Sequence, residues 1–279
     1  MKLRVGELVA RMIPPSAAIE DSYAGKLQEL VEAMADSMLL HILAAWRENT
    51  PAVGFASDTK SSAVRNLERC LAKWGKRWQK KISGMAEPIA VSFAFQTRRD
   101  FDARFARVCR DAGFTVRFQP TREMREAFRA VVAENVNLIR SIPQKFLTDV
   151  QSAVWESVMK GNKTAELSRS IKKSYGVAWR RAALIARDQT HKAKAIMEEA
   201  RRSEVGIEEA VWVHSGAGRE KREEHVRWSR ERRRYKIKRG MWSHKDQAWV
   251  WPGTPINCRC GSRSVFPELG PRQGAVNLR

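Results

Sequence analysis

The sequence lacks the features of three common protein classes. No apolar run approaches the roughly 18 residues that argue for a membrane-spanning helix, so no membrane anchor is expected. Arg4, Glu7 and Arg11 interrupt the apolar residues at the N-terminus, which argues against a secretory signal. Only four cysteines occur in 279 residues. This number is too small for a disulfide framework and predicts a reducing cytoplasm.

Motifs of the common catalytic sites are missing as well. The sequence contains no nucleophile elbow, no Gly-rich phosphate loop and no HExxH helix. An acid–base group could be drawn from four polar residues, Asp188, Arg222, Glu223 and His225. Histidine is the usual proton shuttle, but no sequence pattern fixes the geometry of these residues. We therefore expect no enzymatic activity, and a metal-dependent nuclease or another DNA-modifying enzyme is the alternative.

Positive charge is the strongest feature of the composition. Lys and Arg number 52 against 31 Asp and Glu, a formal net charge of +21, and an excess of this size favours a polyanionic partner. The segment 219–239 holds eleven Lys or Arg against four Glu, a net charge of +7. We predict non-specific binding of double-stranded DNA through ten residues of this segment: Arg219, Arg222, Arg227, Arg230, Arg232, Arg233, Arg234, Lys236, Lys238 and Arg239.

The basic segment carries no signature of sequence-specific recognition. No homeodomain, C₂H₂ finger or RRM motif accompanies it. Its aromatic neighbours Trp228, Tyr235 and Trp242 could stack on bases or pack in a core. Two alternatives to DNA binding remain open: the segment docks on an acidic protein surface, or the protein is basic without a particular polyanionic partner.

Apolar spacing predicts a mostly helical region over residues 1–176. A loose N-terminal arm is expected before a first helix that ends at Asn49-Thr50-Pro51. Pro88 is predicted to open a helix, Pro143 to separate two helices, and Tyr175-Gly176 to end another. Five or six helices are thus expected before the end of this region.

The character of the sequence changes after residue 176. A helix is predicted to reach Glu204 and to end at Gly206, because glycine just past a helix is a common C-terminal signal. The run VWVHS that follows alternates like a strand. The predicted fold class is α+β, with a mostly helical region at 1–176, a small mixed α/β domain at 177–266 and a polar tail at 267–279.

Cys258 and Cys260 are the candidate metal ligands. Residues two apart on an extended chain point to the same face, so both thiolates could reach one ion, with His225, His214 or His244 as a further ligand. The usual zinc spacing is Cys-x₂₋₄-Cys rather than Cys-x-Cys, and cysteine is among the residue types most often buried. We therefore favour two inert, buried cysteines and no cofactor. Zinc bound by Cys258, Cys260 and His225 is the alternative.

Several motifs occur in a characteristic order in the second half of the chain: NVNLIRSIP, SYGVAWRRAALIARDQTHKA, VWVHS, the Arg222-x-x-His225 pair and PINCRC. Together they resemble the phage Mu F-like family of minor head proteins of tailed bacteriophages. Where that family usually has Asp-Glu-Arg-Val-Arg before the histidine, this chain has Gly218-Arg219-Glu220-Lys221-Arg222. The resemblance marks eight residues as a structural motif: Arg187, Asp188, Arg222, His225, Asn257, Cys258, Arg259 and Cys260.

The resemblance implies a minor capsid protein that acts in head morphogenesis and in DNA packaging or delivery. The expected partners are the portal protein, capsid or scaffold components and double-stranded DNA. The expected location is the phage head, with the host cytoplasm during assembly. We expect residues 1–176 to attach the protein to the portal or inner head, because amphipathic helices need partner surfaces. Residues 177–279 are expected to face the packaged DNA, because they hold the densest positive charge.

Overall fold

The computed structural model describes residues 7–48, 59–161, 163–217 and 221–266. The predicted DNA-binding residue Arg219 and the predicted tail at 267–279 lie outside these described residues. The chain divides into two compact units. Unit 1 comprises Met1–Glu20, Val91–Val132 and Arg187–Arg279, and unit 2 comprises Asp21–Ala90 and Ala133–Ala186.

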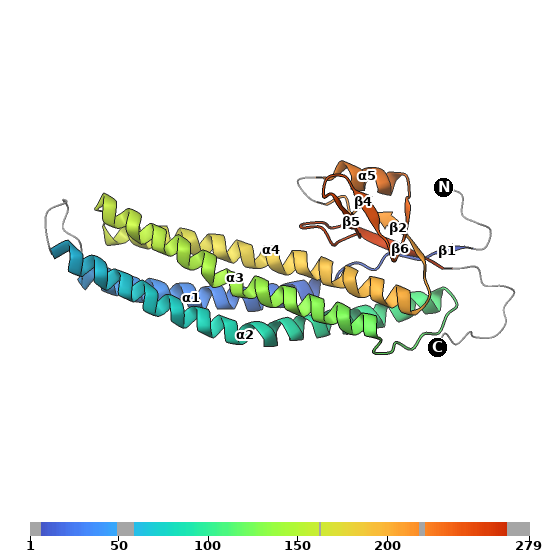
Figure 1. Ribbon diagram of the computed structural model, residues 1–279, viewed down its shortest axis with the longest axis horizontal. Helices are drawn as coiled ribbons and strands as arrows, with labels where there is room; N and C mark the ends of the chain where they lie inside the picture. Colours follow the sequence, from blue (N-terminus) through green and yellow to red (C-terminus); the bar gives the residue numbers. More distant parts are fainter. Residues whose placement is uncertain (1–6, 49–58, 162, 218–220, 267–279) are drawn as a thin grey trace. The chain divides into compact units, whose positions relative to one another are not determined.

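The described residues form long helices followed by a small region of strands and one short helix (Figure 1). The predicted α+β class is therefore confirmed. The helices are α1 (Ala17–Glu48), α2 (Thr59–Asp111), α3 (Arg122–Lys160), α4 (Thr164–Glu204) and α5 (Glu223–Arg230). The strands are β1 (Leu8–Val9), β2 (Glu209–Val213), β3 (Arg234–Lys236), β4 (Met241–Ser243), β5 (Ala248–Val250) and β6 (Gly261–Phe266).

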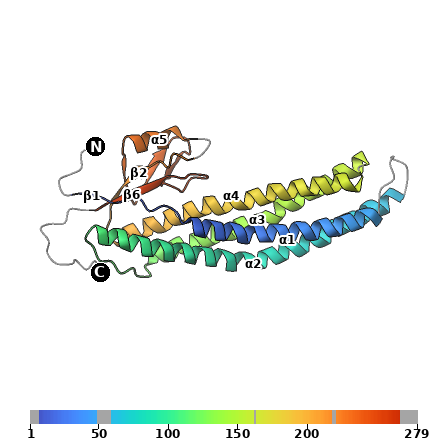
Figure 2. The same ribbon diagram turned by 180° about the vertical axis from the view of Figure 1, so that it is seen from behind.

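Unit 2 consists of helical segments that lie side by side in both views (Figures 1 and 2). They belong to α1, the first part of α2, the second part of α3 and the first part of α4. The apolar stripe predicted on α1 is buried, with Leu27 and Val31 both 0% exposed. Full burial of one such side chain stabilises the fold by about 1.5–3 kcal/mol. A buried hydrogen bond from the Tyr23 hydroxyl to Asn135 Oδ1, 2.8 Å long, links α1 to α3.

Two helices continue through prolines that we expected to interrupt them. Pro88 lies inside α2 and Pro143 lies inside α3. Proline removes one backbone hydrogen bond from a helix, but the neighbouring side chains are buried on both sides. Ala86 and Ala90 are 0% exposed, and Phe146 is 1% exposed. Tertiary packing of these apolar neighbours offsets the lost hydrogen bond, so the predicted breaks are wrong.

The helix α4 also runs without a break through Tyr175-Gly176, where we expected a helix to end. The described residues before position 176 therefore form three complete helices and part of a fourth, instead of five or six. The predicted boundary at residue 176 falls inside α4. The separate roles assigned to the two sides of that boundary stay predictions.

Two predicted helix ends are confirmed, whereas the end predicted for the first helix at Asn49-Thr50-Pro51 lies outside the described residues. The helices α3 and α4 end just before Gly161 and Gly206, which have φ angles of 63° and 72°. Glycine adopts positive φ without the steric penalty of a Cβ atom, so it ends a helix without strain.

Unit 1 contains a four-stranded antiparallel sheet in the order β1-β6-β2-β3. The strand β2 confirms the prediction made from VWVHS. Leu8 and Val9, which we placed in a loose arm, form β1 and pair with the last residues of β6. The arm prediction is therefore wrong for these two residues, because β6 offers them an edge to pair with. A separate two-stranded sheet is formed by β4 and β5.

Aromatic side chains join the sheet of unit 1 to the last part of α2. Phe101 and Phe105 are 0% exposed and stack with ring centroids 5.3 Å apart. In the same cluster, Phe114 stacks on Phe266 of β6 at 5.3 Å. Within the described residues, no helix is both long and apolar enough to cross a membrane.

Candidate functional site

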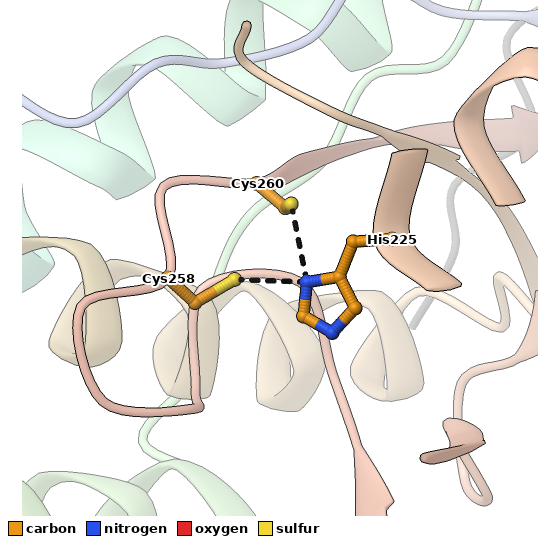
Figure 3. Close-up of side chains that lie close together, drawn as sticks. All are labelled: His225, Cys258 and Cys260. Atoms are coloured by element: carbon orange, nitrogen blue, oxygen red, sulfur yellow. Dashed lines mark hydrogen bonds between the residues drawn. The ribbon is translucent and has the colours of Figure 1, made fainter. Parts of the chain in front are cut away.

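His225, Cys258 and Cys260 meet in the interior of unit 1 (Figure 3). His225 lies on α5, and the two cysteines lie on the loop that leads into β6. The His225 Nδ1 atom is 3.6 Å from each of the two sulfur atoms. The three side chains are 2%, 4% and 6% exposed. The structure therefore brings one of the three candidate histidines to the cysteine pair.

The other two candidate histidines, His214 and His244, make different contacts. The Nδ1 atom of His214 accepts a hydrogen bond from the Gly216 backbone N–H, 3.0 Å away. His244 follows β4, and its backbone N–H donates to the carboxylate of Glu224 at 3.2 Å. Among the described residues, the cluster that could hold a metal ion contains only His225, Cys258 and Cys260.

Three contacts hold the loop that presents the cysteines. The carboxylate of Asp188 on α4 accepts a hydrogen bond from the backbone N–H of Asn257, and Asn257 has a φ of 57°. Asparagine is one of the few non-glycine residues that enter this left-handed region readily. The Arg222 guanidinium donates to the Ile256 carbonyl oxygen at 3.1 Å, and the Cys258 N–H donates to the Pro255 carbonyl oxygen at 2.9 Å.

Six of the eight residues of the predicted structural motif thus lie together in the structure, and two do not share their contacts. Asp188, Arg222 and Asn257 position the loop, and His225 meets the cysteines beneath it. Arg187 instead pairs with Glu20 at 3.2 Å. Arg259 lies half-buried between the two cysteines in sequence, and no role follows for it from the structure.

Tryptophan rings enclose the cluster. The Trp212 ring of β2 meets the His225 ring edge-on at a centroid distance of 4.7 Å. The Trp228 ring, one turn further along α5, stacks on the same imidazole at 5.2 Å. The Nε2 atom of His225 is buried and has no hydrogen-bond partner among the described residues. These rings shield the cluster from bulk solvent, which strengthens electrostatic interactions inside it.

The two thiols of the cluster have opposite shifts in pKa. The hydrogen bond from Cys260 lowers the pKa of the Cys258 thiol, with His225 adding to the shift against the effect of burial. The same hydrogen bond and burial raise the pKa of the Cys260 thiol. These shifts favour ionisation of the Cys258 thiol over that of the Cys260 thiol. The thiolate is the form of cysteine that binds a metal ion.

Most of the predicted DNA-binding residues are exposed. On α5, Arg227 and Arg230 lie on the surface, whereas His225 and Trp228 point into the core. Seven of the ten predicted residues are exposed: Arg227, Arg230, Arg232, Arg233, Lys236, Lys238 and Arg239. Because these side chains are exposed, phosphate groups of DNA can reach them.

Two of the ten predicted DNA-binding residues are half-buried and held in contacts within unit 1. Arg234 is half-buried and pairs with Glu7 at 2.6 Å and with Glu209 at 3.3 Å. Arg222 is half-buried and donates to the loop carbonyl described above. We therefore remove these two guanidinium groups from the set that faces a ligand, and their DNA-binding role is no longer proposed.

A buried ionic cluster of α4 was missed by sequence reasoning. Lys194, Glu198 and Arg202 lie four residues apart and are only 4%, 2% and 1% exposed. Arg202 donates to Glu198 at 2.8 Å and to the Ser262 hydroxyl of β6 at 2.8 Å. The only sequence signal is the opposite-charge spacing i, i+4, which is typical of a solvated helix face. Its burial shows that the cluster joins α4 to the sheet.

Comparison with known proteins gives the same family as the motifs. Residues 148–263 match the family described as phage Mu protein F like protein. An uncharacterized protein of Haemophilus influenzae is 33% identical over 135 residues, which is 48% of this chain and 28% of that protein. The chain thus spans well under half the length of this relative. No solved structure matches. The segment that is similar to the phage Mu protein F like family thus holds the cysteine loop, His225 and the whole of α4.

Proposed function

We propose that this protein is a minor head protein that associates with the portal or inner head and contacts packaged DNA. The observation that carries the proposal is the family match over residues 148–263, which indicates a protein of phage head morphogenesis. The match is consistent with a structural role and no enzymatic activity. The proposed location is accordingly the virion, with the host cytoplasm during assembly.

Charge supports the DNA contact. The seven exposed cations of segment 227–239 occur on α5 and on the loops and strand that follow it. Lys and Arg neutralise phosphates with little regard for base sequence. Arg239 also lies over the Trp249 ring at 4.2 Å, and Trp242 and Trp249 are 38% and 40% exposed. Exposed aromatic rings beside cations stack on unpaired bases, so we propose single-stranded DNA ends as a further target.

Portal attachment is proposed for the helical region at 1–176. Its long helices leave charged faces at the surface, for example Lys76 and Lys80 on α2. Because α4 passes through residue 176 without a break, separate fragments cut at that residue are a poor test. The full chain with surface substitutions keeps α4 intact and is the better reagent.

Phage heads assembled with and without this protein test the proposal. We expect heads that lack it to contain less DNA or to be less infective, and we expect the protein to co-purify with portal complexes. The variant Arg227→Gln, Arg230→Gln, Lys238→Gln should enter heads normally and lower their DNA content or delivery. A protein that is absent from wild-type heads would refute the proposal. Metal-dependent cleavage of DNA by the purified protein would instead support the nuclease alternative.

A further inference from the structure

We propose that His225, Cys258 and Cys260 bind one zinc ion, which fastens α5 to the loop leading into β6. The proposal concerns a metal site and is independent of the role in head assembly. It replaces the expectation of two inert cysteines, which relied on the uncommon Cys-x-Cys spacing. The three side chains come from segments 33 residues apart, and they place their ligand atoms within 4.8 Å of one another.

The distances fit a shared ion. Zinc–sulfur bonds of about 2.3 Å and zinc–nitrogen bonds of about 2.0–2.1 Å, at tetrahedral angles, separate sulfur and nitrogen ligands by about 3.6 Å. His225 Nδ1 lies 3.6 Å from the sulfur of Cys258 and 3.6 Å from that of Cys260. In Figure 3 both sulfur atoms face this one nitrogen.

A hydrogen bond accounts for only one of the two contacts that His225 Nδ1 makes with sulfur. An imidazole nitrogen carries either one proton or one lone pair in the ring plane. It can therefore make one well-directed hydrogen bond to one of the two sulfur atoms, whereas two equal contacts point to a centre between them. A cation at that centre would also fix the tautomer of His225, with the proton on Nε2.

The donor set favours zinc over the hard cations magnesium and calcium. Thiolate and imidazole are ligands of zinc, copper and iron–sulfur centres, whereas magnesium and calcium take oxygen ligands. Zinc binding removes the protons of both thiols, and the divalent cation compensates the charge that two buried thiolates would otherwise carry. Two cysteines separated by one residue can both face the ion, because alternate residues of an extended chain share a face.

The site is structural in our interpretation. Three protein ligands leave a fourth tetrahedral position, which we assign to a water molecule, since the described residues supply no fourth side chain. The ligands are at most 6% exposed, so a substrate has little access to that position. The ion connects α5 to the cysteine loop. The helix α5 carries Arg227 and Arg230 at the surface.

Metal analysis of the full-length protein, expressed without a histidine tag in zinc-supplemented medium, tests the proposal. We expect one zinc per chain in the wild type and almost none in Cys258→Ser or His225→Gln. Cys70→Ser is the matched control, because Cys70 belongs to unit 2 and the cluster belongs to unit 1, and this variant should keep its zinc. A chelator should lower the unfolding temperature of the wild type and of Cys70→Ser.

The contrary results are equally defined. A wild-type protein that is folded, zinc-free and unaffected by chelator or added zinc would overturn the proposal. So would zinc that persists in both Cys258→Ser and His225→Gln. If these variants fail to fold, chelator-treated wild type is titrated with cobalt. Binding of one cobalt with sulfur-to-metal charge-transfer absorption supports the site, and absence of that absorption refutes it.

Discussion

The guanidinium of Arg234 makes two hydrogen bonds with the carboxylate of Glu7, one of 2.6 Å and one of 3.0 Å. The two residues are 227 positions apart in sequence, and both side chains are mostly buried, at 16% and 13% exposure. Glu7 directly precedes β1, and Arg234 begins β3. These are the two outer strands of the sheet, so the contact links its two edges. Paired hydrogen bonds between charged groups are among the strongest polar contacts in proteins.

This contact predicts a measurable coupling between Glu7 and Arg234. A double-mutant cycle with Glu7→Gln and Arg234→Gln should give a coupling free energy on the order of 1–3 kcal/mol, measured by denaturant unfolding. The exposed pair Arg122–Glu126, four residues apart on α3, is the control and should give a much smaller coupling, because solvent screens exposed ion pairs. Equal coupling in the two cycles would show that the Glu7–Arg234 contact is not formed in solution.

Glu199 predicts a dependence of stability on pH. Burial raises the pKa of its carboxyl from 4.5 to about 7, with nearby Glu198 adding to the shift and Arg202 opposing it. The folded protein therefore holds one proton more than the unfolded chain between pH 4.5 and about 7. The free energy of unfolding therefore falls by at most about 3 kcal/mol as pH rises through this window, and it stays constant above the window.

The variant Glu199→Gln should remove this dependence, because glutamine does not titrate. Denaturant unfolding at pH 5, 6, 7 and 8 measures the free energy of unfolding. Subtracting the value of the variant from that of the wild type at each pH cancels the contribution of the histidines, which both proteins share. Glu208→Gln removes the same charge from an exposed neighbour and should keep the wild-type pH profile. Identical profiles for all three proteins would rule out a raised pKa for Glu199.

The continuity of α4 predicts the effect of replacing Gly176. A Cβ atom at this position would meet only the Arg180 side chain, at an ordinary 3.6 Å. Inside a helix, alanine is favoured over glycine by about 0.8–1.0 kcal/mol, so Gly176→Ala should raise the free energy of unfolding by up to that amount. Gly206→Ala is the control and should destabilise by about 1 kcal/mol, because Gly206 has a φ of 72°. Destabilisation by both substitutions would mean that α4 ends near residue 176.

The exposed cations of α5 and the residues after it predict salt-dependent binding of duplex DNA. Each lost phosphate contact should reduce the slope of log affinity against log salt by about 0.9. The variant Arg227→Gln, Arg230→Gln, Lys238→Gln should bind all sequences more weakly and with a flatter slope. The control Lys76→Gln, Lys80→Gln, Lys172→Gln removes the same charge from exposed positions of unit 2. If the two variants lose affinity equally, net charge alone explains binding.

Local pattern was enough to predict much of the fold. The apolar stripe of α1, the helix ends at Gly161 and Gly206 and the strand β2 each depend on residues close together in sequence. Spacing of three or four residues defines a helix face, and glycine relieves positive φ wherever it occurs. The motif order also indicated the similarity to the phage Mu F-like family, and the match over residues 148–263 confirms this similarity.

The remaining features depend on contacts between distant residues, which spacing cannot supply. Pro88 and Pro143 remain inside helices because packed neighbours offset a lost hydrogen bond. Arg234 looked like one more surface cation, but its partner is Glu7 at the other end of the chain. Sequence alone named His225, Cys258 and Cys260 and could not say that they meet. Only the tertiary structure places the three ligand atoms around one point, because α5 and the cysteine loop each depend on packing against the sheet for their position.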